Sequence, residues 1–133
     1  MYLSTLSTNE KRLFLTLAFE VLKADGQISS SEARIIMSYA AQLGVPFDKE
    51  DLNTDIDGVI SELQSSSARV KRIILLELLR LSLSDDEAEN NELALIGELS
   101  KVFGFDDQVL KEASDVALTL VKAAQAQEKF IAG

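Results

Sequence analysis

The chain contains 133 residues, with 13 Lys and Arg against 22 Asp and Glu, which gives a formal net charge of 13 − 22 = −9. It has no Cys, His or Trp. Without Cys and His, a disulfide, a thiolate nucleophile, a zinc site and a Ser-His-Asp relay are all excluded. We expect no zinc and no haem, and any bound metal should be a hard cation with oxygen ligands.

The length, with 47% hydrophobic and 26% charged residues, predicts one globular domain over residues 1–133. The negative charge argues against binding to nucleic acid and to anionic membranes. No targeting segment is visible, because the first basic residue is Lys11 and no apolar stretch precedes it. The most apolar run, 73–83, contains Glu77 and Arg80 and is too short to span a bilayer. We therefore expect a cytoplasmic protein that does not insert into membranes.

The first two predicted helices have clear ends. The first helix begins near Ser7, whose hydroxyl can cap the helix while Glu10 reaches back to it, and it ends at Gly26. The second helix runs from about Ser30 to Leu43 and ends at Gly44. Both helices have apolar residues at helical spacing, which predicts one buried face on each.

The rest of the chain is also predicted to be helical. Between residues 48 and 63 the pattern weakens, and we expect one or two short helices there. The next helix, about 68–83, is apolar on most sides from Ile73 onward and should be the central element of the core. Two more helices follow, at about 90–103 and 107–126. Because β-branched residues occur at helical spacing and do not alternate, we predict no strand and an all-α fold.

An internal repeat relates two parts of the chain. A shift of 60 residues aligns 13–47 with 73–107 without a gap. The repeat predicts a compact bundle built from two helical hairpins that pack with approximate two-fold symmetry. Glu20 and Arg80 are equivalent under the shift, so we expect them to form an ion pair across the central helices.

Each repeat carries an acidic loop between its two helices. Asp25 precedes Glu32 by seven residues in the first loop, and Asp85 precedes Glu92 by seven residues in the second. The first loop is similar to the second half of an EF-hand calcium loop, with Asp, Gly, Ile and Glu at the same spacing. The acidic ligands of the first half are missing, so a standard EF-hand is rejected.

Two copies of a helix ending in Asp-Gly-x-Ile-x-x-x-Glu, about 60 residues apart in an acidic helical chain, resemble the TerB-like tellurite-resistance family. This family also supplies the N-terminal domain of some membrane-anchored DnaJ-type co-chaperones. The resemblance covers residues 8–105 and implies a bundle of about seven helices, with carboxylates from both loops that can take a divalent cation. The ligands it implies by position are Asp25, Glu32, Asp85 and Glu92, with Asp86 and Glu89 as weaker candidates. The second loop departs from the pattern, since Asp86 and Ala88 replace the glycine and the isoleucine.

The charge of the second loop gives a separate argument for a metal. Residues 85–92 contain five acidic residues and no basic residue. If this loop lies near the first one, repulsion between the carboxylates raises their proton affinity or recruits a cation. Calcium fits better than magnesium, because it accepts more oxygen ligands in a looser geometry.

Helix capping offers a different explanation of the same residues. Ser29 and Glu32 can form a capping box, and Gly26 is an ordinary helix stop, so the first loop needs no ligand. The five acids of the second loop exceed what one helix start can use. Capping alone, a metal site and another acidic binding surface are therefore the three alternatives.

These observations predict a non-catalytic module. The serine clusters have no His partner and no Gly-rich phosphate loop is present, so we expect neither a serine hydrolase nor a bound nucleotide. The family resemblance implies a role in tellurite or other stress responses, or in the assembly of a protein complex. The main alternative is a metal-free adaptor that docks a protein through its acidic face or its C-terminal helix, where exposed Phe130 and Ile131 would favour contact. A magnesium-dependent hydrolase is the third possible function.

Overall fold

The computed structural model describes residues 2–23, 28–46, 55–84 and 90–133 of the chain. These residues form helices and short connections, and no strand occurs among them. The predicted all-α class is therefore confirmed. The count of about seven helices and the two-fold symmetry stay predictions.

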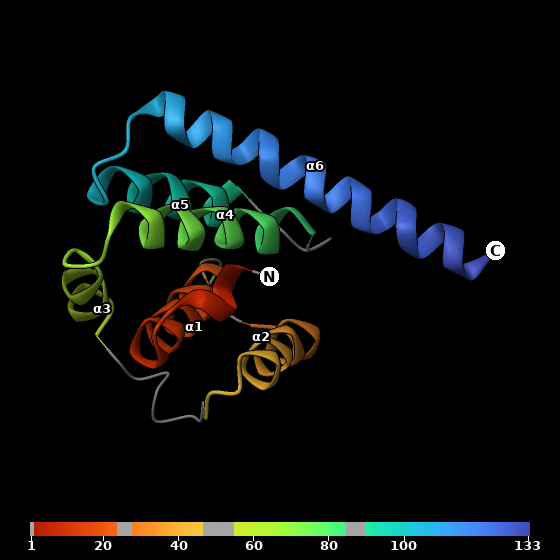
Figure 1. Ribbon diagram of the computed structural model, residues 1–133, viewed down its shortest axis with the longest axis horizontal. Helices are drawn as coiled ribbons and strands as arrows, with labels where there is room; N and C mark the ends of the chain where they lie inside the picture. The colour runs from red at the N-terminus through yellow and green to blue at the C-terminus, as the bar shows by residue number, and fades with distance from the viewer. Residues whose placement is uncertain (1, 24–27, 47–54, 85–89) are drawn as a thin grey trace.

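Six α-helices and one 3₁₀ helix make up the described part of the fold (Figure 1). They are η1 (Tyr2–Thr5), α1 (Thr8–Leu22), α2 (Ser30–Leu43), α3 (Ile56–Leu63), α4 (Ala68–Ser84), α5 (Asn90–Val102) and α6 (Asp107–Ala132). Among these helices, none combines the length and the apolar character that a membrane crossing needs.

Side-chain caps explain where α1 and α2 begin, and a glycine explains where α2 ends. Ser7 Oγ accepts a hydrogen bond from the Glu10 amide at 3.1 Å, and Glu10 Oε1 accepts one from the Ser7 amide at 3.0 Å. Ser29 and Glu32 form the same capping box at the start of α2. Gly44 ends α2 with a φ of 66°, a left-handed conformation that glycine adopts without steric cost. The predicted starts of both helices and the predicted end of α2 are confirmed. α1 ends earlier than predicted, at Leu22 with Lys23 as its C-cap, and the expected stop at Gly26 lies outside the described residues.

The core lies around α1 and α4. α1 packs against α2, α3, α4 and α5, and α4 packs against α5, α6 and η1. Their fully buried side chains include Phe14 and Leu15 on α1 and Ile74 and Leu78 on α4. Burial of such a side chain contributes about 1.5–3 kcal/mol to the free energy of unfolding. The prediction that the helix at 68–83 is the centre of the core is confirmed.

The predicted ion pair between Glu20 and Arg80 is wrong. Glu20 Oε1 lies 3.4 Å from Lys23 Nζ, and Arg80 Nη1 lies 3.8 Å from Glu77 Oε1. Each charge therefore has an opposite charge three residues away on its own helix. Such local neighbours are available without any particular packing of α1 against α4.

α6 is longer than the sequence predicts, because it continues past residue 126 to Ala132. No glycine or proline occurs between residues 105 and 132, so nothing in the sequence stops the helix before Gly133. Figure 1 shows the first half of α6 along α4 and the second half extending beyond the other helices. Its buried residues are Ala117 and Val121, and every residue from 122 onward is exposed.

Candidate functional site

Two of the predicted metal ligands lie in the described part of the structure. Glu32 is in the first turn of α2, and Glu92 is in the first turn of α5. The other candidates, Asp25, Asp85, Asp86 and Glu89, lie outside the described residues. Within the described part, no group of three acidic side chains is placed to hold a metal ion.

Glu32 is a buried member of a capping box. Its Oε1 accepts a hydrogen bond from the Ser29 amide at 3.0 Å, and Ser29 Oγ accepts one from the Glu32 amide at 3.1 Å. Ser29 Oγ also lies 3.0 Å from Ser31 Oγ. Glu32 is only 4% exposed, whereas Glu10 makes the equivalent box on α1 and stays partly exposed. The predicted capping box is confirmed. Glu32 is more deeply buried than Glu10, which makes the same kind of box on α1.

Glu92 connects the start of α5 to the end of α4. Its side chain is 2% exposed, and Oε1 accepts a hydrogen bond from Ser82 Oγ at 3.1 Å. Ser82 is itself completely buried. The sequence analysis did not identify Ser82, although a lone hydroxyl near the end of the apolar run at 73–83 is the signal that could have shown it.

A third buried acid, Glu77, lies on α4 and is not one of the predicted ligands. It is 4% exposed, and its Oε2 has no hydrogen-bond partner among the described residues. Burial raises the pKa of this carboxyl, and the positive charge of Arg80 opposes the shift. Sequence reasoning used Glu77 only to exclude a membrane span, although an acid within an apolar run of a central helix is a signal of a buried polar group.

Tyr39 on α2 lies within electrostatic reach of Glu77 and Arg80. Burial, followed by the negative charge of Glu77, raises the pKa of Tyr39 to about 12, and Arg80 opposes the shift. The phenol therefore stays protonated at neutral pH and can donate a hydrogen bond. Its ring packs against Phe14, with ring centroids 5.8 Å apart and an angle of 55° between the rings. The sequence alone gives no sign of these neighbours, because they lie on other helices.

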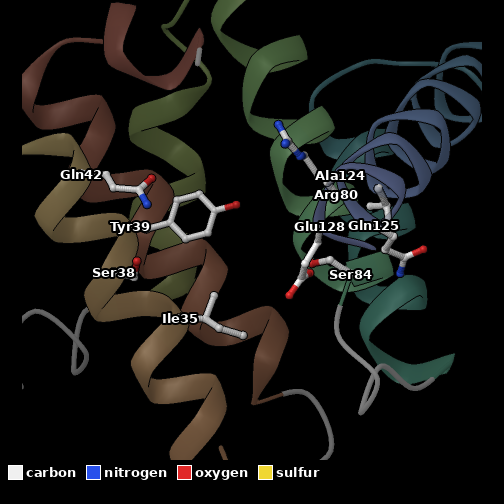
Figure 2. A pocket seen from close by; sticks show the side chains of 10 residues that line it. Ile35, Ser38, Tyr39, Gln42, Arg80, Ser84, Ala124, Gln125 and Glu128 are labelled. Carbon is white, nitrogen blue, oxygen red and sulfur yellow. The ribbon is translucent and has the colours of Figure 1, made fainter. Parts of the chain in front are cut away.

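An open groove of about 540 Å³ lies between α2, the end of α4 and the second half of α6. Figure 2 shows Tyr39 on one side of this groove, and Arg80, Ser84 and Gln125 on the other. The residues that line it are Ile35, Ser38, Tyr39, Gln42, Arg80, Ser84, Val121, Ala124, Gln125 and Glu128. The sequence did not predict this groove, because three separate helices form it.

No family model, no curated protein and no solved structure matches the chain. The resemblance to the TerB-like family therefore depends on the repeated acidic motif alone and stays a prediction.

Proposed function

We propose that the protein is a non-catalytic TerB-like binding module whose two acidic helix junctions together bind one divalent cation. The observation that supports this proposal most directly is the burial of Glu32 and Glu92, which lie 60 residues apart in the first turns of α2 and α5. Glu10 serves a capping box while partly exposed to water, so capping does not by itself require a buried carboxylate. A cation shared by the two junctions would compensate the cost of burying two acids.

Calcium is the cation that this site would favour. The segment from Asp85 to Glu92 supplies five carboxylates without a basic residue, and Asp25 adds another in the first loop. Calcium takes about six to eight oxygen ligands and tolerates irregular geometry, whereas magnesium demands a nearly ideal octahedron. By the family resemblance, the module would act in tellurite or other stress responses, or in complex assembly.

Calorimetric titration of calcium into chelator-treated protein tests this proposal. We expect one cation per chain, and at least tenfold weaker binding in both Asp25→Ala and Asp85→Ala. Glu98→Gln is the matched control, because Glu98 is an exposed acid on α5 and its loss should leave the affinity unchanged. Absence of binding would contradict the proposal. Two independent sites, each lost with only its own loop, would contradict a shared site.

A second candidate function is a metal-free adaptor that docks a protein through the end of α6. The observation in its favour is that Phe130 and Ile131 are 86% and 75% exposed on a part of α6 that extends beyond the bundle. Large exposed apolar side chains on a helix are typical of helix-in-groove recognition. A photo-crosslinking residue at position 130 should give one defined adduct in cells, and the same residue at exposed position 108 should not. Identical adducts from both positions would contradict this candidate.

A further inference from the structure

The groove between α2, α4 and α6 contains none of the residues that the cation proposal uses. Its volume of about 540 Å³ lies within the range of about 300–1,000 Å³ that is typical of small-molecule sites. Ile35, Val121 and Ala124 give it aliphatic surface, while its polar side chains come from all three helices. Three aliphatic side chains among seven polar ones suit a small molecule that has a short apolar body and one polar end.

Arg80 carries a positive charge in this groove that is only weakly paired. Its Nη1 lies 3.8 Å from Glu77 Oε1, which is longer than a hydrogen bond, and its side chain is partly exposed. Arg80 therefore keeps the capacity to bind another carboxylate, whose two oxygens match the planar fork of a guanidinium.

Tyr39 places a hydrogen-bond donor on the opposite side of the groove. Figure 2 shows its hydroxyl pointing from α2 into the space between the helices. The hydroxyl makes no hydrogen bond to any of the described residues, and contact with Phe14 helps to hold the ring in place. A ligand oxygen in the groove would give this hydroxyl an acceptor.

We propose that this groove binds a small organic monocarboxylate, with Arg80 pairing with the carboxylate, Tyr39 donating a hydrogen bond to it, and the aliphatic surface covering its hydrocarbon body. A single negative charge is favoured for two reasons. Glu128 also lines the groove, and the whole chain carries a net charge of −9, so a polyanion would be repelled. The proposal is independent of the cation site.

Titration of the full-length chain with benzoate, followed through backbone amide NMR signals, tests this proposal. We expect saturable shifts at the amides of Tyr39, Arg80 and Gln125. Benzamide has nearly the same shape and no charge, so it should bind at least tenfold more weakly because it cannot pair with Arg80. Equal affinity for the two compounds, or no saturable shift at these amides up to millimolar benzoate, would overturn the proposal. This comparison uses the wild-type chain and does not depend on the folding of any variant.

Variants show which side chains recognise the carboxylate. Arg80→Gln should weaken benzoate binding at least tenfold and bring it to the level of benzamide, and Tyr39→Phe should weaken it by about fivefold. Arg34→Gln is the matched control, because Arg34 is exposed on α2 outside the groove and the change in net charge is the same. An equal loss in Arg34→Gln and Arg80→Gln would assign the effect to net charge and overturn the proposed site. Thermal unfolding midpoints close to the wild-type value would show that the variants are folded.

Discussion

The fold opposes the ionisation of Glu77, because burial raises the pKa of its carboxyl. Its carboxyl is buried on the central helix α4, one of its oxygens lacks a hydrogen-bond partner among the described residues, and Arg80 approaches the other only to 3.8 Å. Because the pKa of Glu77 is higher in the folded state than in the unfolded state, the folded state binds more protons than the unfolded state at pH values between the two pKa values. Stability is then highest below the unfolded pKa and falls as the pH rises through the folded pKa.

Replacement of Glu77 by Gln tests this effect. At neutral pH we expect Glu77→Gln to raise the free energy of unfolding by about 1 kcal/mol, because the cost of burying a charge disappears. The advantage should shrink as the pH is lowered from about 8 to about 4, where wild-type Glu77 becomes neutral as well. Urea denaturation at a series of pH values measures both curves. If the free energies of unfolding of the wild type and Glu77→Gln differ by the same amount at every pH, the pKa of Glu77 is not raised.

The contact between Ser82 and Glu92 gives a second prediction at this scale. Ser82→Ala removes the 3.1 Å hydrogen bond to a carboxylate that is 2% exposed, so we expect a loss of about 1–3 kcal/mol in the free energy of unfolding. Ser84→Ala is the matched control, because Ser84 is exposed and its hydroxyl donates to the Leu81 carbonyl of the same helix. Chemical denaturation compares the two variants. Equal losses would show that the Ser82 contact contributes nothing beyond an ordinary exposed hydroxyl.

At the scale of elements, α6 combines a packed half and an exposed half. Its buried residues are Ala117 and Val121, and all residues from 122 onward are exposed. The first half therefore belongs to the core, while the second half contributes little burial. The exposed half of α6 borders the groove and carries the exposed side chains of Phe130 and Ile131.

Truncation of the chain after residue 126 tests this division of α6. We expect the midpoint of thermal unfolding to change by no more than about 2 °C, because the removed residues are all exposed. Leu78→Ala is the comparison, and it should cost about 2–5 kcal/mol because Leu78 is fully buried on α4. A truncation as costly as Leu78→Ala would mean that the end of α6 packs against the rest of the protein in solution.

The helix ends show how much of the fold the sequence contains. The starts of α1 and α2 and the end of α2 could be predicted because Ser7, Ser29 and Gly44 determine local backbone conformations that depend on a few neighbouring residues. The predicted end of α6 at residue 126 is too early. The chain has no stop signal there, and helix-forming residues continue the helix to Ala132.

The candidate site was less accessible to prediction than the helices. The capping role of Glu32 follows from its distance to Ser29 in the sequence, but its burial depends on packing. The partner of Glu92, the burial of Glu77 and the groove beside Arg80 all depend on how separate helices approach one another. The expected pair of Glu20 with Arg80 failed for the same reason: equivalence in a repeat does not determine where two side chains point.

For the whole molecule, the proposed cation site would connect the net charge of −9 with the repeat. The sequence places five acids in the segment 85–92, among them the buried Glu92, and Glu32 is buried at the equivalent helix start. If the two junctions share a cation as proposed, its binding should stabilise the native state. Binding to the native state alone adds about 2.7 kcal/mol at a ligand concentration 100 times the dissociation constant.

Thermal unfolding of the wild-type chain in calcium, in magnesium and in chelator tests whether the two junctions share a cation. We expect a midpoint that rises with calcium by several degrees and rises less with magnesium. In Asp25→Ala and in Asp85→Ala the midpoint should stay at the chelator value. A wild-type midpoint that is the same in chelator and in millimolar calcium would contradict the cation site and leave helix capping as the whole role of the two junctions.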